Sequence, residues 1–103
     1  MKGMSKVIIY GLVDPRSNKL FYVGSTKNLD QRIRLYLLGG DRGSSVRSTI
    51  CQLIDCGLRF KVRIIETVDA VVRDEREGFW IAKYRSDGEP LVNRRNPTPR
   101  RVK

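Results

Sequence analysis

The sequence contains no histidine, which excludes the most common general base and the most common nitrogen ligand of metal sites. It has only two cysteines, Cys51 and Cys56, and no second pair accompanies them, which argues against a structural zinc site. On a helix, their spacing would point the two thiols in different directions, so we expect reduced, mostly buried thiols and no disulfide. The longest apolar run, Val7 to Val13, includes a glycine and is far shorter than a membrane span of ~20 residues.

Acidic residues are few compared with basic ones. The 21 lysines and arginines exceed the 11 aspartates and glutamates by 10, the formal net charge. This excess favours a polyanion as partner, with nucleic acid first among the candidates. The last ten residues, 94–103, hold five basic side chains, no acidic ones and two prolines. We therefore predict a domain over residues 1–93 followed by a disordered basic tail over 94–103.

The apolar pattern predicts one α+β domain, a small three-stranded antiparallel sheet flanked by helices in the order β-β-α-α-β-α. Strands are expected over residues 6–13, 20–24 and 58–64, with a turn over 14–18. In the first strand, Ile8, Tyr10 and Leu12 would share one face, and Val7, Ile9 and Val13 the other. Helices are expected from a capping box of Asn28 and Gln31 to Leu38, from Ser44 or Ser45 to Gly57, and from an Asp69 cap to about Arg85. The apolar stripes of the first two helices are Leu29, Ile33, Tyr36 and Leu37, then Val46, Ile50, Leu53 and Ile54. Residues 91–93 are expected to pack back onto the domain.

The last helix places one carboxylate on its apolar face. Trp80, Ile81 and Tyr84 follow Glu77 by three, four and seven residues, whereas Glu75 points elsewhere. A carboxylate on a core-facing stripe costs several kcal/mol unless it is paired or binds a metal. Two interpretations remain open at this point, a buried salt bridge to Arg32 or Arg73 and a metal ligand.

Four further residues become candidates for the site once Glu77 is considered. Arg32 lies beside the apolar stripe of the first helix; alone it is typical of an exposed arginine, but beside a carboxylate it becomes a candidate for bidentate phosphate binding. Tyr10 and Tyr22 would be cross-strand neighbours or nearly so, and ordinary sheet packing is the alternative for both. Gly24 weakens a strand interior and is typical of a close approach by backbone or ligand.

Taken in order, these residues form a known pattern. Ile8-Ile9-Tyr10, Tyr22-Val23-Gly24, Arg32, Glu77 in Glu-x-x-Trp-Ile, and Asn93 resemble the GIY-YIG nuclease superfamily over about residues 7–93. The stretch from Tyr22 to Arg32 is similar to phage homing-endonuclease catalytic domains and to the N-terminal nuclease of the bacterial excision-repair incision enzyme. Ile8 stands where the family has glycine, Ser25 where repair enzymes carry lysine, and Gly43 where some homing enzymes have histidine. The serine favours the homing branch over the repair branch. The resemblance as a whole implies DNA repair or a mobile element as the setting.

The resemblance implies a metal-dependent endonuclease that hydrolyses DNA phosphodiester bonds with one Mg²⁺ or Mn²⁺ held by Glu77. It implies that Arg32 stabilises transition-state charge, that Tyr10 and Tyr22 orient and activate the attacking water, with Tyr10 as the general base, and that Tyr36 lies near the scissile phosphate. Gly24 and Asn93 would support the site. Basic residues expected to contact DNA are Lys27, Arg34, Arg42, Arg47, Arg94 and Arg95.

Contacts to the DNA backbone position a protein without specifying a sequence, so we expect weak or structure-based selectivity. A targeting protein or an additional domain could supply more. We expect no membrane partner, because the N-terminus lacks a signal-peptide layout, and we expect a cytoplasmic location in a bacterial, phage or virus-infected cell. Two alternatives come from other classes. One is a non-catalytic basic nucleic-acid-binding module with the same fold, whose binding would depend steeply on salt. The other is a basic structural protein such as a ribosomal component.

Overall fold

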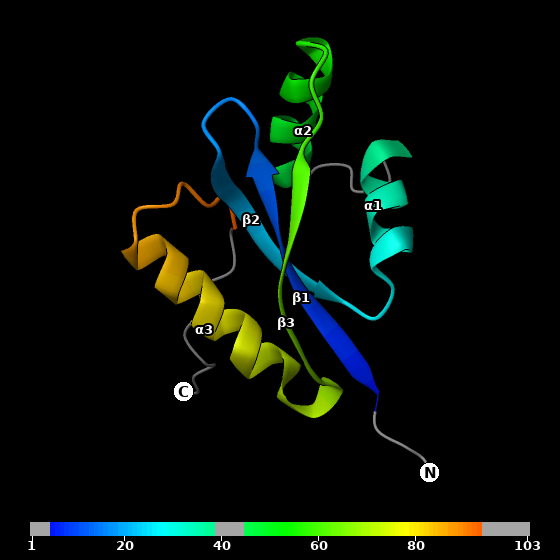
Figure 1. Ribbon diagram of the computed structural model, residues 1–103, viewed down its shortest axis with the longest axis vertical. Helices are drawn as coiled ribbons and strands as arrows, with labels where there is room; N and C mark the ends of the chain where they lie inside the picture. The colour runs from blue at the N-terminus through cyan, green and yellow to red at the C-terminus, as the bar shows by residue number, and fades with distance from the viewer. Residues whose placement is uncertain (1–4, 39–44, 94–103) are drawn as a thin grey trace.

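The computed structural model of the protein describes residues 5–38 and 45–93. Its elements are β1 (Lys6–Asp14), β2 (Lys19–Thr26), α1 (Leu29–Leu38), α2 (Ser45–Asp55), β3 (Lys61–Asp69), a 3₁₀ helix (Ala70–Val72) and α3 (Arg73–Ser86). The strands form one antiparallel sheet in the order β2-β1-β3 (Figure 1). These elements confirm the predicted α+β class and the order β-β-α-α-β-α. The predicted tail and the predicted loop over residues 39–43 lie outside the described residues.

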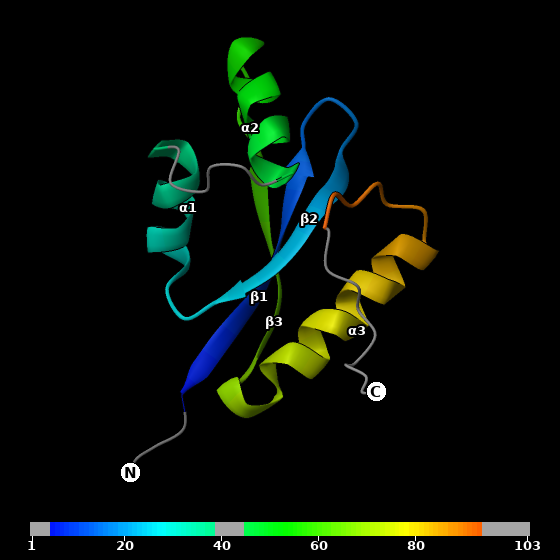
Figure 2. The same cartoon turned by 180° about the vertical axis from the view of Figure 1, so that it is seen from behind.

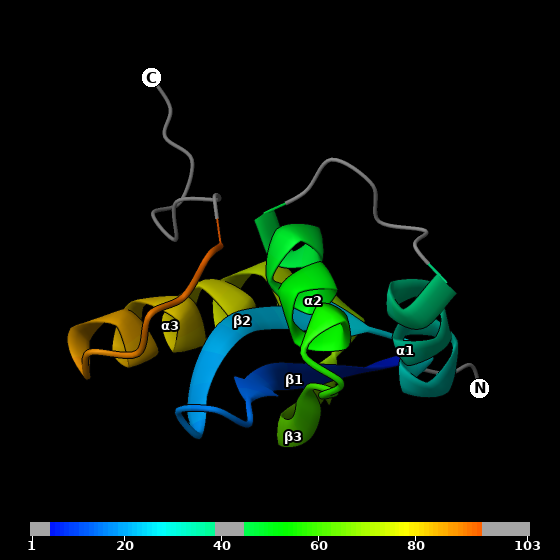
Figure 3. The same ribbon diagram turned by 90° about the horizontal axis from the view of Figure 1, so that it is seen from above.

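The central strand β1 is buried on both faces, because its side chains alternate between two helical layers. The cluster on the side of α1 and α2 consists of Tyr10, Leu12, Phe21, Tyr36, Val46, Ile50 and Leu53. The cluster on the side of α3 consists of Ile9, Val23, Val68 and Ile81. Figure 2 and Figure 3 show α1 and α2 separated from α3 by the sheet. The predicted split of β1, with Ile8, Tyr10 and Leu12 on one face, is confirmed.

The helix α1 begins directly after β2 through a side-chain cap. Asn28 Oδ1 accepts a hydrogen bond from the Gln31 N–H at 3.0 Å, as an N-cap residue does. The Asn28 N–H donates to Thr26 Oγ1 at 3.1 Å. The predicted cap is therefore present, but Thr26 takes the place that the capping box gives to the Gln31 side chain.

The third strand lies later in the sequence than predicted, at Lys61–Asp69 in place of 58–64. The alternating apolar residues begin too early because Leu58 belongs to the end of α2. The Leu58 N–H donates to the Leu53 carbonyl at 2.8 Å, the Gly57 N–H donates to the Ile54 carbonyl at 2.9 Å, and Gly57 has φ 77°. These two bonds are those of a Schellman motif. The strand then continues beyond residue 64 because it pairs with β1 as far as Lys6, with a bulge between Ile9 and Tyr10.

The predicted Asp69 cap of the last helix is wrong. The Asp69 side chain makes no capping hydrogen bond and instead accepts one from Lys6 Nζ at 2.7 Å. A 3₁₀ turn follows it, and α3 starts at Arg73. The cationic side chain of Arg73 therefore stands at the first residue of α3, next to the end of β2 in space.

Two smaller expectations also need correction. Both thiols are free, but Cys56 is exposed because it lies in the turn at the end of α2, and only Cys51 is half-buried. Ile54, expected on the apolar stripe of α2, is 47% exposed. Within residues 5–38 and 45–93, no helix has the length and apolar character needed to cross a membrane.

Replacing Asn28 by alanine is expected to lower the free energy of unfolding by about 1 kcal/mol, because the Gln31 N–H loses its cap. Asn28→Asp retains a capping oxygen and is expected to stay close to wild type. Urea unfolding followed by circular dichroism measures both variants. Equal stability of the alanine and aspartate variants would contradict the capping role.

Candidate active site

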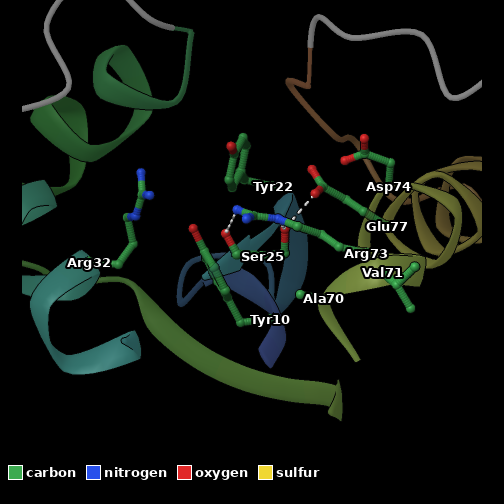
Figure 4. A pocket seen from close by; sticks show the side chains of 9 residues that line it. All are labelled: Tyr10, Tyr22, Ser25, Arg32, Ala70, Val71, Arg73, Asp74 and Glu77. Atoms are coloured by element: carbon green, nitrogen blue, oxygen red, sulfur yellow. Dashed lines mark hydrogen bonds between the residues drawn. The ribbon is translucent and has the colours of Figure 1, made fainter. Parts of the chain in front are cut away.

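An open cleft of about 440 Å³ lies where β1, β2, α1, the 3₁₀ helix and α3 meet. Its lining consists of Tyr10, Tyr22, Ser25, Arg32, Ala70, Val71, Arg73, Asp74 and Glu77 (Figure 4). Four predicted site residues are therefore brought together from four different elements. In Figure 4, Arg32 and Glu77 lie on opposite sides of the cleft, with the two tyrosines between them.

The absent side chain of Gly24 makes room for both tyrosines. The strand register places Gly24 opposite Tyr10 and Leu12 opposite Tyr22, so the tyrosines are diagonal neighbours on one face. Their ring centroids are 6.4 Å apart. A Cβ atom on Gly24 would lie 2.7 Å from Tyr10 Oη and 2.8 Å from Tyr22 Cε2. The predicted close approach at Gly24 is therefore an approach of tyrosine side chains, and any larger residue would displace them.

Tyr10 and Tyr36 form a buried pair of phenols. Their hydroxyl oxygens are 2.7 Å apart and each side chain is 1% exposed. Tyr36 is absent from the cleft lining and contacts the site through Tyr10 and through Tyr22, whose ring centroid lies 6.4 Å from its own. Burial raises the pKa of both phenols, and for Tyr10 the hydrogen bond to Tyr36 and the charge of Arg32 act in the opposite direction. Both groups are therefore protonated phenols at neutral pH.

Glu77 is half-buried and its partner is a serine. Ser25 Oγ donates to Glu77 Oε1 at 2.6 Å. Neither Arg32 nor Arg73 forms an ion pair with Glu77 among the described residues, so the buried salt bridge considered from the sequence is not present there. Arg73 donates to Ser25 instead, from Nε to Oγ at 2.7 Å and from Nη2 to the carbonyl oxygen at 3.0 Å.

The donor set of the cleft fits a hard divalent cation held by one protein carboxylate. Oε1 of Glu77 is oriented by Ser25, and no hydrogen bond to Oε2 is formed within the described part of the chain. That part contains no group of three or more histidine, cysteine, aspartate or glutamate side chains that could enclose a metal. Mg²⁺ suits such an open site because it keeps several waters and binds through one or two carboxylates and substrate phosphates.

Asn93 is hydrogen-bonded to the backbone of β2 at Val23. Its side chain accepts a hydrogen bond from the Val23 N–H at 3.0 Å and donates one to the Val23 carbonyl at 2.8 Å. The Arg85 guanidinium donates to the Asn93 carbonyl, and the Val92 N–H donates to the Phe21 carbonyl at 2.7 Å. Residues 91–93 thus pack back against the outer edge of β2 and fix the backbone between Tyr22 and Gly24.

Several cleft residues were missed or undervalued in the sequence. Asp74 precedes Glu77 by three residues and therefore shares its side of the helix, a spacing that could have identified it. Ser25 was noted only as a departure from the repair enzymes, and Arg73 only as an alternative ion-pair partner. Their contacts join residues 48 positions apart, and no local pattern indicates them.

Three of the predicted DNA-contacting residues, Lys27, Arg34 and Arg47, stand outside the cleft lining. Lys27 and Arg34 are exposed, Lys27 just after β2 and Arg34 on α1. Arg47 is half-buried on α2 and donates to the Tyr36 carbonyl at 3.5 Å. Arg42, Arg94 and Arg95 lie outside the described residues.

Comparison with known proteins identifies one family. The family model described as the GIY-YIG catalytic domain matches residues 6–93, nearly the whole chain. The comparisons with curated proteins and with solved structures gave no significant match.

Replacing Gly24 by alanine is expected to lower the free energy of unfolding by about 1–3 kcal/mol, because the added methyl overpacks a site bounded by Tyr10 and Tyr22. Chemical denaturation measures the loss. The aromatic NMR signals of both tyrosines are expected to shift. Wild-type stability with unchanged tyrosine signals would contradict the close approach.

Stability is expected to fall as the pH rises above the ordinary tyrosine pKa of 10.0, because the folded state raises the pKa of Tyr10 and Tyr36. Above that pH the unfolded chain releases phenol protons that the folded chain retains, so the free energy of unfolding decreases. Urea unfolding across the alkaline range tests this. Tyr36→Phe is expected to flatten the dependence, and an unchanged slope would argue against it.

Proposed function

This chain belongs to the GIY-YIG family, whose members are endonucleases, and from that premise we propose that it hydrolyses DNA phosphodiester bonds with one divalent metal ion in the cleft. The observation that carries the proposal is the convergence of Tyr10, Tyr22, Arg32 and Glu77 on one cleft from four elements. Chance packing has no reason to gather a carboxylate, a fixed cation and two phenols around open space.

The two charged residues divide the electrostatic work. Glu77 would hold Mg²⁺ or Mn²⁺ through its carboxylate, and the ion would supply Lewis acidity and stabilise negative charge. Arg32 lies across the cleft from Glu77 (Figure 4) and offers a planar set of N–H donors to the non-bridging phosphate oxygens. A phosphate bound at Arg32 would meet the positive charge of the guanidinium while negative charge grows on its oxygens.

The tyrosines hold the attacking water. Tyr10 and Tyr22 line the cleft, and a phenol hydroxyl can accept one proton of a water and donate its own. The Tyr10 hydroxyl also lies 2.7 Å from that of Tyr36, and either hydroxyl can donate the hydrogen bond between them. The role of Tyr10 as general base requires loss of its own proton, which burial opposes and the charge of Arg32 favours.

DNA as the substrate is supported by the net charge of +10 and by exposed basic side chains such as Lys27 and Arg34. These residues contact backbone phosphates, which gives affinity without sequence readout. We therefore propose weak or structure-based selectivity, with any further targeting supplied by a partner protein or an additional domain, and a cytoplasmic site of action.

Glu77→Gln and Arg32→Ala are expected to lower the rate of plasmid nicking in Mg²⁺ by about 100-fold or more, because each removes a group that stabilises the transition state. EDTA is expected to abolish nicking by wild type. Glu75→Gln is the matched control, since Glu75 lies on the same helix but is exposed and outside the cleft lining. Gel analysis of supercoiled plasmid measures all variants.

If Glu77→Gln or Arg32→Ala nicks plasmid at the wild-type rate, the proposal is wrong. If wild type binds DNA with a steep salt dependence but never nicks it in Mg²⁺ or Mn²⁺, the chain is a non-catalytic binding module instead.

A further inference from the structure

Two cleft residues to which the family resemblance assigned no role form a chain of hydrogen bonds that ends on Glu77. Arg73 donates to Ser25, and Ser25 donates to Glu77. We propose that Arg73 and Ser25 are positioning residues that orient the Glu77 carboxylate for metal binding. This inference rests on the proposed function, because it takes Glu77 as the metal ligand.

The direction of the hydrogen bonds that join Arg73, Ser25 and Glu77 follows from which of their atoms can donate. The guanidinium of Arg73 has only donors, and an ionised carboxylate such as that of Glu77 has only acceptors. Ser25 has one donor and can both accept and donate. With its oxygen accepting from Arg73 Nε at 2.7 Å, its single proton points at Glu77 Oε1, 2.6 Å away. No other arrangement of protons satisfies both contacts.

Ser25, which lies between Arg73 and Glu77 in this series of hydrogen bonds, is held firmly by the fold. Ser25 is 7% exposed, near the end of β2. Arg73 contacts it twice, because Nη2 also donates to the Ser25 carbonyl at 3.0 Å. The two contacts tie the side chain and the backbone of the serine to the first residue of α3. Hydrogen bonds in such a half-buried setting are strengthened by the reduced local dielectric.

These contacts act on the carboxylate of Glu77, which follows Arg73 by four residues on α3. Oε1 is held by the serine, so the plane and rotation of the carboxylate are set, and Oε2 stays available for a cation. Groups that orient a metal ligand in this way typically change metal affinity by about 10–100-fold when they are removed. The 3₁₀ turn matters here because it delays the start of α3 and places Arg73 at its first position.

Two other roles for Arg73 make different predictions. As a pure charge in the cleft, it would repel a cation, and its removal would tighten metal binding. As a purely structural clamp between β2 and α3, its removal would lower stability and leave the metal affinity of the folded protein unchanged. Of the three roles, only positioning predicts that metal binding becomes weaker when the positive charge of Arg73 is removed.

Mn²⁺ binding to the protein without DNA tests the inference, by electron paramagnetic resonance titration of wild type, Ser25→Ala, Arg73→Ala and the double variant. Each single variant is expected to bind Mn²⁺ about tenfold more weakly or worse. The double variant is expected to match the weaker single variant, because the two residues act in series. Glu77→Ala defines background binding. Arg76→Ala is the matched control: it removes one positive charge from α3, and Arg76 pairs with Glu66 at 3.0 Å, away from Ser25.

Thermal unfolding without metal, run on the same variants, separates binding from folding. The inference alone is overturned if wild type binds Mn²⁺ through Glu77 and both single variants bind equally well, or if Arg73→Ala binds more tightly. Absence of Glu77-dependent binding in wild type would instead overturn the metal role of Glu77 in the proposed function, and the inference with it. Weaker binding by Arg76→Ala equal to that of Arg73→Ala would also overturn it, since a loss shared by both variants cannot come from the contact between Arg73 and Ser25.

Discussion

The whole structure depends on the double burial of β1. This strand pairs with β2 on one edge and β3 on the other, and its side chains fill two separate apolar clusters. One helical layer must therefore cover each face. The layer of α1 brings Arg32, and the layer of α3 brings Glu77. The cleft forms where both layers reach the paired ends of β1 and β2, so the chemistry of the site follows from the constraint that one apolar strand be covered on both sides.

Within the cleft, the arrangement of charges keeps the carboxylate available. An arginine paired directly with Glu77 would neutralise it and compete with a cation. Arg73 instead donates its hydrogen bonds to Ser25, and the uncharged hydroxyl of Ser25 donates one hydrogen bond to the Glu77 carboxylate. Beside the cleft, Tyr10 and Tyr36 form a buried pair of phenols. Their burial keeps them protonated, so they contribute hydrogen bonds and shape at neutral pH.

Sequence patterns predicted the elements well wherever the residues that define them are local. The cap at Asn28, the two faces of β1 and the side of α3 that carries Glu77 all depend on spacings of a few residues, and all were confirmed. Predictions failed where a distant partner decides. The strand β3 extends to Asp69 because β1 offers a ladder that far, and Asp69 leaves its capping role because Lys6, 63 residues earlier, binds its carboxylate.

By itself, the sequence determined the family, the order of the elements and the identity of the four residues that meet in the cleft, because periodicity and short motifs are encoded locally. Only the tertiary structure decided how these residues are held. It placed Tyr36 against Tyr10 and outside the cleft lining, clamped Val23 with Asn93 from 70 residues away, and joined Arg73 through Ser25 to Glu77. Such contacts arise from the packing of α3 against the end of β2, and no pattern within either segment contains them.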